Sequence, residues 1–281
     1  MHRPRRRKRH PLAFPIFLLC AVLLCMALPR FAARLAHNAG TGSPQVANFI
    51  LPDGTDQEKL QVIADHYPAA KPVAQNPDAY PKELVDLLIR NPETASFVAE
   101  YPHGKPKQTK INLKKETTQN GFPHLLQWDA RWGYDSYGES TIALSGCGPT
   151  CLSMVYIGLT GDTSITPAVL CQKSAENGYY KKGAGTLWAL MTEGAKQLGL
   201  TSREIPLEMS LMKAELAKGR PLILSLRKGD FTTDGHFIVV TGVDESGEFQ
   251  ILDPNSRLRS QTTWSMDRLK KQINNIWAFT R

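Results

Sequence analysis

The sequence lacks the residue spacings that hold a structural metal ion. Its 281 residues include five cysteines and seven histidines, with no Cys-x-x-Cys pair and no His-x-x-x-His pair. Such pairs supply many structural zinc ligands, so a zinc site has no support. Cys147, Cys151 and Cys171 lie beyond the N-terminal region, and an odd number leaves at least one thiol free unless a bridge joins two chains. The sequence neither requires nor excludes a bridge between Cys151 and Cys171.

Beyond residue 36 the chain also lacks net charge. The formal charge of +8 comes entirely from residues 1–36, which contain eight Lys and Arg residues and neither Asp nor Glu. The other 26 basic residues equal the 26 acidic residues in number. Nucleic-acid binding requires an excess of positive charge on the folded surface. We therefore expect no nucleic-acid partner.

The longest apolar run lies within this basic N-terminal region. Residues 12–28 are uncharged and would span about 25 Å as a helix, slightly less than a bilayer core. The run exceeds the apolar core of a cleavable signal, about 7–15 residues, and no small-x-small cleavage site follows directly. Because a basic flank stays in the cytoplasm, we interpret residues 1–36 as a cytoplasmic flank and signal anchor. This predicts a single-pass protein of the cell membrane with an extracytoplasmic C-terminal domain, or a secreted protein if the segment is cleaved.

Residues 37–120 read as a linker followed by a short helical stalk. Residues 53–66 and 82–91 have helical character, and the second range places Leu84, Leu87 and Leu88 at helical spacing. The Pro-rich residues 67–81 read as a connector, and the polar residues 103–121 as a second linker. We expect this region to space or brace the domain that follows.

The composition changes at Gly121, where aromatic residues become frequent and a domain of residues 121–281 begins. The hydrophobic pattern predicts helices over residues 149–159, 166–178, 185–200 and 211–219. It then predicts strands over residues 220–229, 236–247, 248–256 and 276–281. Helices followed by strands with hairpin-length connections indicate an α+β fold with an antiparallel sheet. The aromatic residues Trp128, Trp132 and Tyr137 either line a substrate groove or pack in the core.

Cys147 has the surroundings of a nucleophile. It lies between Gly146 and Gly148 and is followed by Pro149, which suits the first turn of a helix. The predicted position at a helix N-terminus favours the thiolate form, because unpaired N–H groups and the positive end of the helix dipole lie nearby. The flanking glycines would leave room for a substrate carbonyl, and the Cys147 N–H could stabilise an oxyanion.

His236 and Asp253 are the predicted partners of this thiol. His236 is the only histidine after residue 124 and begins a predicted strand, while Asp253 ends the next one. In an antiparallel hairpin the start of one strand and the end of its neighbour meet at the same edge. An imidazole that exchanges protons with the thiol and a carboxylate that orients the ring complete the set for nucleophilic catalysis.

The stretches QWDARWG, GCGPTCLSM and GHFIVVTGVDESGEFQILDPN resemble the C39-like cysteine peptidases of the papain-like superfamily, in particular a stand-alone membrane-anchored type. The resemblance covers residues 122–281 and implies a fold in which an N-terminal helix carries the nucleophile and packs on an antiparallel sheet. It implies Cys147 as nucleophile, His236 as general acid and base, and Asp253 as the residue that orients the ring. It also implies Gln127 as a side-chain donor to the oxyanion, although the glutamine of many papain-like sequences lies about six residues before the cysteine, where this chain has Thr141.

The predicted function is therefore hydrolysis of a peptide or cell-wall peptide by an anchored extracytoplasmic cysteine peptidase. No cofactor is expected, because side chains and backbone amides supply the whole reaction. The alternatives are an amide hydrolase directed at peptidoglycan and an inactive binding or scaffold module. In the inactive case Cys147 would be a small buried residue, His236 a strand-end histidine, Asp253 part of an ordinary turn and Gln127 a surface amide.

Overall fold

The computed structural model describes residues 50–104, 111–116 and 118–281, all of which belong to one compact unit. The predicted flank and anchor, residues 1–36, lie outside the described residues. Among the residues that are described, no helix combines the length and the apolar character needed to cross a bilayer.

A helical segment, residues 55–103, precedes the sheet domain. Its α-helices are α2 (Asp56–His66), α3 (Lys71–Gln75), α4 (Lys82–Arg90) and α5 (Ala95–Ala99). Short 3-10 turns join them at residues 68–70, 77–79 and 92–94, and a fourth, at residues 101–103, follows α5. The Pro-rich residues 67–81 connect α2 to α4 through short helical turns, because proline fits the first turn of a helix. The apolar faces of these helices form one buried cluster with residues of the sheet domain.

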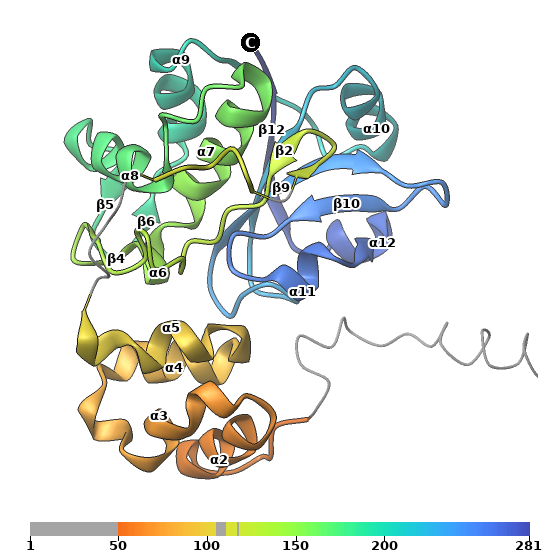
Figure 1. The fold of residues 1–281 in the computed structure, drawn as a ribbon. Helices are drawn as coiled ribbons and strands as arrows, with labels where there is room; N and C mark the ends of the chain where they lie inside the picture. The colour runs from red at the N-terminus through yellow and green to blue at the C-terminus, as the bar shows by residue number, and fades with distance from the viewer. Residues whose placement is uncertain (1–49, 105–110, 117) are drawn as a thin grey trace, which may run out of the picture. The chain divides into compact units, whose positions relative to one another are not determined.

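One antiparallel sheet organises the rest of the chain (Figure 1). Its strand order is β11-β10-β9-β8-β12-β7. The strands are β7 (Thr201–Glu204), β8 (Leu222–Leu226), β9 (His236–Val243), β10 (Phe249–Leu252), β11 (Thr263–Trp264) and β12 (Ile273–Thr280). The four predicted strands correspond to β8, β9, β10 and β12, while β7 and β11 are short strands at the two edges of the sheet that the pattern did not indicate.

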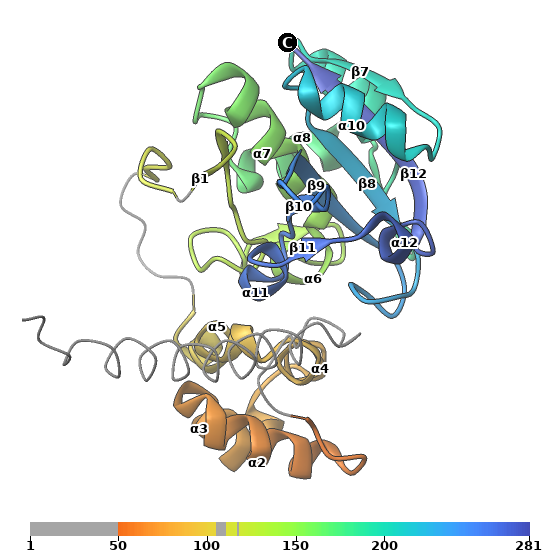
Figure 2. The ribbon, with the colours of Figure 1, turned by 90° about the vertical axis from the view of Figure 1, so that its right-hand side faces the viewer.

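Helices cover both faces of the sheet, and the strand residues alternate between them. Ile223 and Val239 join the core beneath α7 (Cys147–Thr160) and α8 (Pro167–Glu176). Leu224 and Ile238 join the core beneath α10 (Met209–Ala217). The short helices α11 (Arg257–Ser260) and α12 (Met266–Leu269) lie with α10 on this side, as the two ribbon views show (Figures 1 and 2). The α+β class with an antiparallel sheet is therefore confirmed.

Residues 185–200 differ from the single helix that was predicted. They contain the short strand β6 (Gly185–Thr186), which pairs with β5 (Tyr180–Lys181). A π-helical turn, Leu190–Gly194, and the short α9 (Ala195–Gln197) follow. Leu190, Met191 and Ala195 are buried, as the apolar spacing predicted, but the helical region covers fewer residues than predicted.

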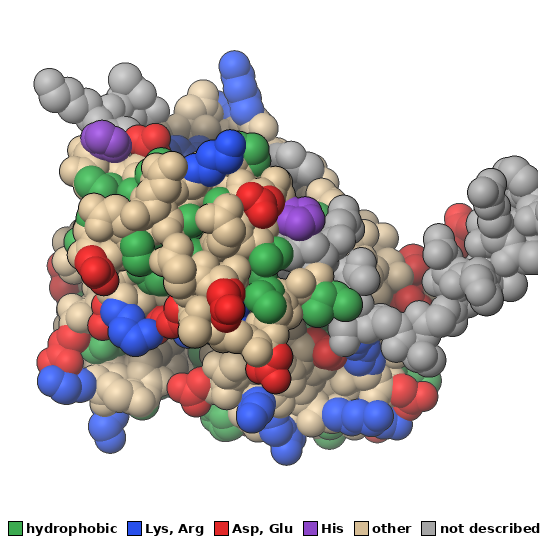
Figure 3. Space-filling view, turned by 90° about the horizontal axis from the view of Figure 1, so that it is seen from below, with side chains coloured by type: hydrophobic (Ala, Val, Ile, Leu, Met, Phe, Trp, Pro, Cys, Tyr) green, Lys and Arg blue, Asp and Glu red, His purple; other side chains and the backbone are tan. Residues whose placement is uncertain are grey.

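Five further short elements precede α7. They are the hairpin strands β1 (Thr118–Gln119) and β2 (Phe122–Pro123), the pair β3 (Ser136–Tyr137) and β4 (Ser140–Thr141), and the helix α6 (Ile142–Ser145). The molecular face in Figure 3 shows acidic and basic side chains interspersed rather than separated by sign. This distribution matches the balanced charge of the chain beyond residue 36.

Candidate active site

Cys147 is the first residue of α7 and is half-buried, whereas Cys151 and Cys171 are buried. All three thiols are free, so the chain has no Cys151–Cys171 bridge. The helix begins here because Gly146 ends α6 and Pro149 occupies the first turn of α7. The predicted position of Cys147 at a helix N-terminus is therefore confirmed.

Packing explains the two glycines beside the thiol. A Cβ atom on Gly146 would lie 2.6 Å from the Ile142 carbonyl oxygen, and one on Gly148 would lie 2.8 Å from Thr186 Cγ2. Neither position accepts a side chain without local rearrangement, because such contacts lie far inside van der Waals distance. The glycines thus allow α6 and β6 to approach the start of α7. This packing is a second reason for glycine at these positions, besides the expected access for substrate.

The structure brings His236 and Asp253 together at one edge of the sheet. His236 is the first residue of β9 and pairs with Leu226 of β8, while Asp253 directly follows β10. The His236 Nε2 atom lies 2.7 Å from Asp253 Oδ1. The Cys147 thiol is close enough to influence the ionisation of His236, and both side chains line the same pocket. Because Nε2 faces Asp253, Nδ1 is the ring nitrogen left for the thiol.

The surroundings of His236 favour its protonated form. Burial lowers its pKa, but the charge and hydrogen bond of Asp253 and the interaction with Cys147 outweigh burial and raise the pKa to about 9. Burial also tends to raise the pKa of Asp253, but Arg259 and His236 dominate and lower it. At neutral pH this arrangement holds an imidazolium beside an ionised carboxylate.

Sequence reasoning missed Arg259 and Ser260. The buried Arg259 places Nε 3.0 Å from Asp253 Oδ2, on the oxygen that His236 does not contact. Ser260 Oγ accepts a 2.8 Å hydrogen bond from the Asp253 N–H, and His124 Nε2 lies 2.8 Å from the Asp253 carbonyl oxygen. No motif in the sequence marks these partners. The need of a buried carboxylate for a charged donor could have suggested Arg259, whereas Ser260 bonds the Asp253 backbone N–H.

Gln127 is buried beside the thiol rather than exposed on the surface. Its Nε2 donates a 2.7 Å hydrogen bond to the Ala143 carbonyl oxygen, and its own N–H donates to the Pro254 carbonyl oxygen at 2.7 Å. A side-chain amide has two N–H donors, so one is left after the bond to Ala143. The second N–H has no hydrogen-bond partner among the residues that the structure describes.

Cys147, His236 and Gln127 line one pocket with a volume of about 510 Å³. The connection between β8 and β9 forms one wall, and Leu87 and Arg90 of α4 contribute from the helical segment. The lining residues are Leu87, Arg90, Gln127, Ala143, Leu144, Cys147, Gly229, Asp230, Phe231, Thr232, Thr233, Asp234, Gly235, His236, Asn255 and Arg259. We call this pocket the catalytic cleft.

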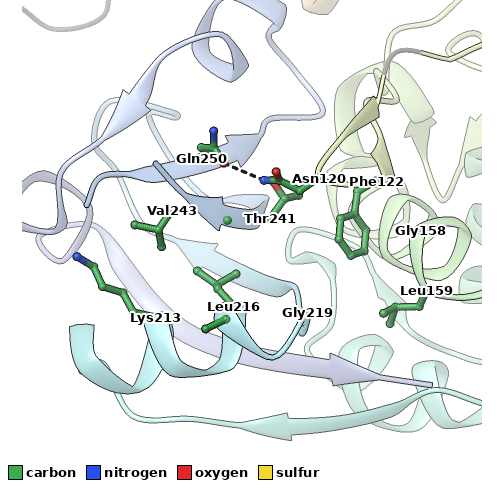
Figure 4. Close-up of a pocket in the computed structure, with 12 residues that line it drawn as sticks. Asn120, Phe122, Gly158, Leu159, Lys213, Leu216, Gly219, Thr241, Val243 and Gln250 are labelled. Carbon is green, nitrogen blue, oxygen red and sulfur yellow. Dashed lines mark hydrogen bonds between the residues drawn. The ribbon is translucent and has the colours of Figure 1, made fainter. Parts of the chain in front are cut away.

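A larger pocket, of about 700 Å³, lies at the other end of α7 (Figure 4). Asn120 Nδ2 donates a 2.8 Å hydrogen bond to Gln250 Oε1 across it, and Gly158 and Leu159 supply the helix side. The rise of an α-helix separates these two residues from Cys147 by about 16 Å. This pocket has no cysteine, histidine or acidic residue in its lining, so the catalytic cleft is the candidate active site despite its smaller volume.

The aromatic residues near residue 130 serve the core. Trp128, Trp132 and Tyr137 are all buried and none of them lines the catalytic cleft. The Tyr137 hydroxyl is hydrogen-bonded to the hydroxyls of Ser174 and Thr186, at 2.8 and 2.9 Å. Within the described residues, no group of three or more His, Cys, Asp or Glu side chains is placed to hold a metal ion.

Comparison with known proteins gives one family match. The Peptidase_C39 like family matches residues 119–281. A similar solved structure is the peptidase domain of Streptococcus ComA, a bi-functional ABC transporter involved in a quorum sensing pathway. The two sequences are 25% identical, and the match covers 48% of this chain and 89% of that chain, with a TM-score of 0.36. The search of curated proteins found no match.

Proposed function

Because the chain belongs to the Peptidase_C39 like family, we propose that it is a cysteine peptidase that cleaves peptide bonds with Cys147, His236 and Asp253. One observation carries this proposal. His236 is hydrogen-bonded to Asp253 through Nε2, and it lines the catalytic cleft together with the neighbouring Cys147 thiol. A nucleophile, a proton carrier and an orienting group in that order form the arrangement that thiol catalysis requires.

The reaction follows from these positions. The Cys147 thiolate attacks the substrate carbonyl carbon, and the carbonyl oxygen becomes an oxyanion. The N–H of Cys147, in the first turn of α7, and the second N–H of Gln127 Nε2 stabilise this oxyanion. The C–N bond then breaks while the His236 imidazolium donates its proton to the leaving amine. A thioester then joins Cys147 to the acyl group. His236 removes a proton from water, the water oxygen attacks the carbonyl carbon of the thioester, and the sulfur of Cys147 leaves.

We also propose that the domain acts outside the cytoplasm and is anchored in the cell membrane by residues 12–28. The uncharged run and its basic flank support this location. The substrate would then be a peptide or a cell-wall peptide outside the membrane. Arg90 on one side of the catalytic cleft and Asp234 on the other side present both signs of charge to such a substrate.

The first experiment uses the full chain purified in detergent, with a mixture of unstructured peptides and with cell-wall fragments as separate substrates. Mass spectrometry identifies new termini or released stem peptides and thereby separates the two substrate classes. Cys147→Ala must abolish hydrolysis, whereas Cys171→Ala, which removes a buried thiol, should retain it. If Cys147→Ala keeps the activity, the proposed reaction is wrong.

Thiol labelling tests the site without any substrate. Iodoacetamide should alkylate Cys147 faster than a free thiol at neutral pH, because the nucleophile of a cysteine peptidase must be reactive at that pH. The buried Cys151 and Cys171 should react only when the protein unfolds. A Cys147 that reacts no faster than an ordinary thiol would favour an inactive binding module.

A further inference from the structure

The helical segment reaches the residues that follow β10, which we call the Asp253 loop (residues 253–259). Glu93, in the turn between α4 and α5, directs its carboxylate at this loop. One oxygen accepts a hydrogen bond from the Ser256 hydroxyl. The other accepts from the N–H groups of Arg257 at 2.8 Å and Leu258 at 3.2 Å. A single half-buried carboxylate therefore satisfies three donors of the loop.

A second contact from the same turn fixes the middle of the loop. The fully buried Asn91 donates from Nδ2 to the carbonyl oxygen of Asn255. Trp128 Nε1 donates to that carbonyl oxygen as well, at 2.9 Å. The Asn255 N–H in turn donates to Asp253 Oδ1 at 2.8 Å, the same oxygen that faces His236. The contacts of the helical segment thus continue through one residue to the carboxylate beside the imidazole.

The loop carries two side chains of the candidate site. Asp253 begins it and Arg259 ends it, and the two side chains meet at 3.0 Å. Arg259 also donates from Nη1 to the Phe231 carbonyl oxygen at 2.8 Å, in the wall of the catalytic cleft. A shift of the loop would move both the carboxylate that orients His236 and the guanidinium that contacts this wall.

We propose that Glu93 is a positioning residue for the hydrolysis, and that it acts by holding the Asp253 loop in the conformation in which Asp253 orients His236. This inference rests on the proposed function. Segment 55–103 then belongs to the active site, although the family match begins only at residue 119. Leu87 and Arg90, which line the catalytic cleft from α4, place the same segment next to the substrate.

Glu93 could instead serve only to attach the helical segment to the domain. The two roles predict different results for a variant that still folds. Attachment alone affects thermal unfolding and leaves the ionisation of His236 unchanged. Positioning changes the ionisation, because His236 keeps its raised pKa only while Asp253 stays in place, and burial lowers the pKa otherwise.

The test compares Glu93→Gln and Glu93→Ala with Glu83→Gln in the full chain. Glu83 is an exposed residue of α4 and serves as the matched control, since no hydrogen bond joins it to the Asp253 loop among the described residues. In both Glu93 variants kcat should fall by about tenfold or more, because small displacements of catalytic groups cost this much. KM should change by less than about threefold, since the substrate-contacting residues are intact. The alkaline limb of the pH profile should move to lower pH.

Nuclear magnetic resonance of the ¹⁵N-labelled His236 ring gives a readout that does not need activity. The titration midpoint of His236 should lie lower in both Glu93 variants than in the wild type and in Glu83→Gln. If the wild type hydrolyses nothing, the proposed function fails, and this titration still decides the role of Glu93. An unchanged midpoint in folded Glu93 variants would overturn the inference.

Ser256→Ala provides a second test if the Glu93 variants fail to fold. It removes one donor to Glu93 from the loop side and leaves the helical segment unaltered. Glu93→Asp, whose shorter side chain keeps the charge, should recover part of kcat and part of the His236 midpoint. The inference is wrong if Ser256→Ala and Glu93→Asp both titrate and turn over like the wild type while Glu93→Gln is merely less stable.

Discussion

The sheet domain and the helical segment contribute to the catalytic cleft in different ways. In the sheet domain the reacting groups come from the ends of regular elements, namely the start of α7, the start of β9 and the residue after β10. In the helical segment Asn91 and Glu93 contact the Asp253 loop, while Leu87 and Arg90 line the cleft without taking part in the bond-making steps. The reacting groups and the residues that position them thus come from different parts of the chain. Substitutions in one part at a time can test this difference.

The largest effect should come from the sheet domain. His236→Ala removes the proton donor for the leaving amine, and the rate should fall by about 10³-fold or more. The measurement is kcat/KM on the best peptide found. Cys171→Ala, which removes a buried thiol of the same domain outside the cleft, is the control for general damage. Comparable losses in the two variants would contradict the assignment of His236.

Leu88→Ala tests the helical segment through its core. Leu88 is fully buried in the cluster shared by the segment and the sheet domain. The free energy of unfolding should fall by about 2–5 kcal/mol, the usual cost of such a cavity. Denaturant unfolding measures this loss, and activity at a temperature where the variant stays folded should be near wild type. Activity that vanishes in a fully folded Leu88→Ala protein would show that the segment does more than hold the loop.

The pH dependence follows from the raised pKa of His236. A raised pKa in the folded state stabilises the protein below the unfolded value of about 6.5, and this contribution is lost as pH rises through about 9. The kcat/KM profile should have its alkaline limb in the same range. Asp253→Asn should move that limb to lower pH, because the charge that raises the pKa is gone. An alkaline limb that stays near pH 9 in this variant would show that Asp253 does not raise the pKa of His236.

The smallest effect should come from Arg90, at the end of α4. Arg90 is exposed where it lines the cleft, so an ion pair with substrate is worth about 0.2–1 kcal/mol. Arg90→Glu should raise KM for acidic peptides and lower it for basic ones by up to about fivefold, with kcat unchanged. Kinetics on a pair of peptides that differ only in charge provide the measurement. Equal KM values for both peptides in both proteins would exclude Arg90 from substrate contact.

Local signals in the sequence predicted much of the sheet domain. The Gly-Cys-Gly-Pro stretch marked the start of α7, and the switch from helical to alternating apolar spacing marked β8, β9 and β10. The proximity of His236 and Asp253 followed from hairpin geometry alone. These predictions succeeded because each depends on residues close together in the chain.

The remaining features depend on contacts between distant residues. Glu93 meets the Asp253 loop although 164 positions separate it from Arg257, and no local pattern records such a pairing. Nothing in the sequence distinguishes Arg259 from the other basic residues near it, and only the fold buries it against Asp253. The helix predicted over residues 185–200 shortened because Gly185 and Thr186 pair with β5 instead.

The apolar cluster shared by the helical segment and the sheet domain has a consequence for the design of truncated versions of this protein. Leu126, Trp128 and Ala143 belong to the sheet domain, yet they are buried in the cluster built by the helices of residues 55–103. A fragment cut at the family boundary would expose this surface to water, and such fragments self-associate through newly exposed apolar area. The smallest soluble version should therefore begin before Thr55, and inactivity of a shorter one would say nothing about its thiol.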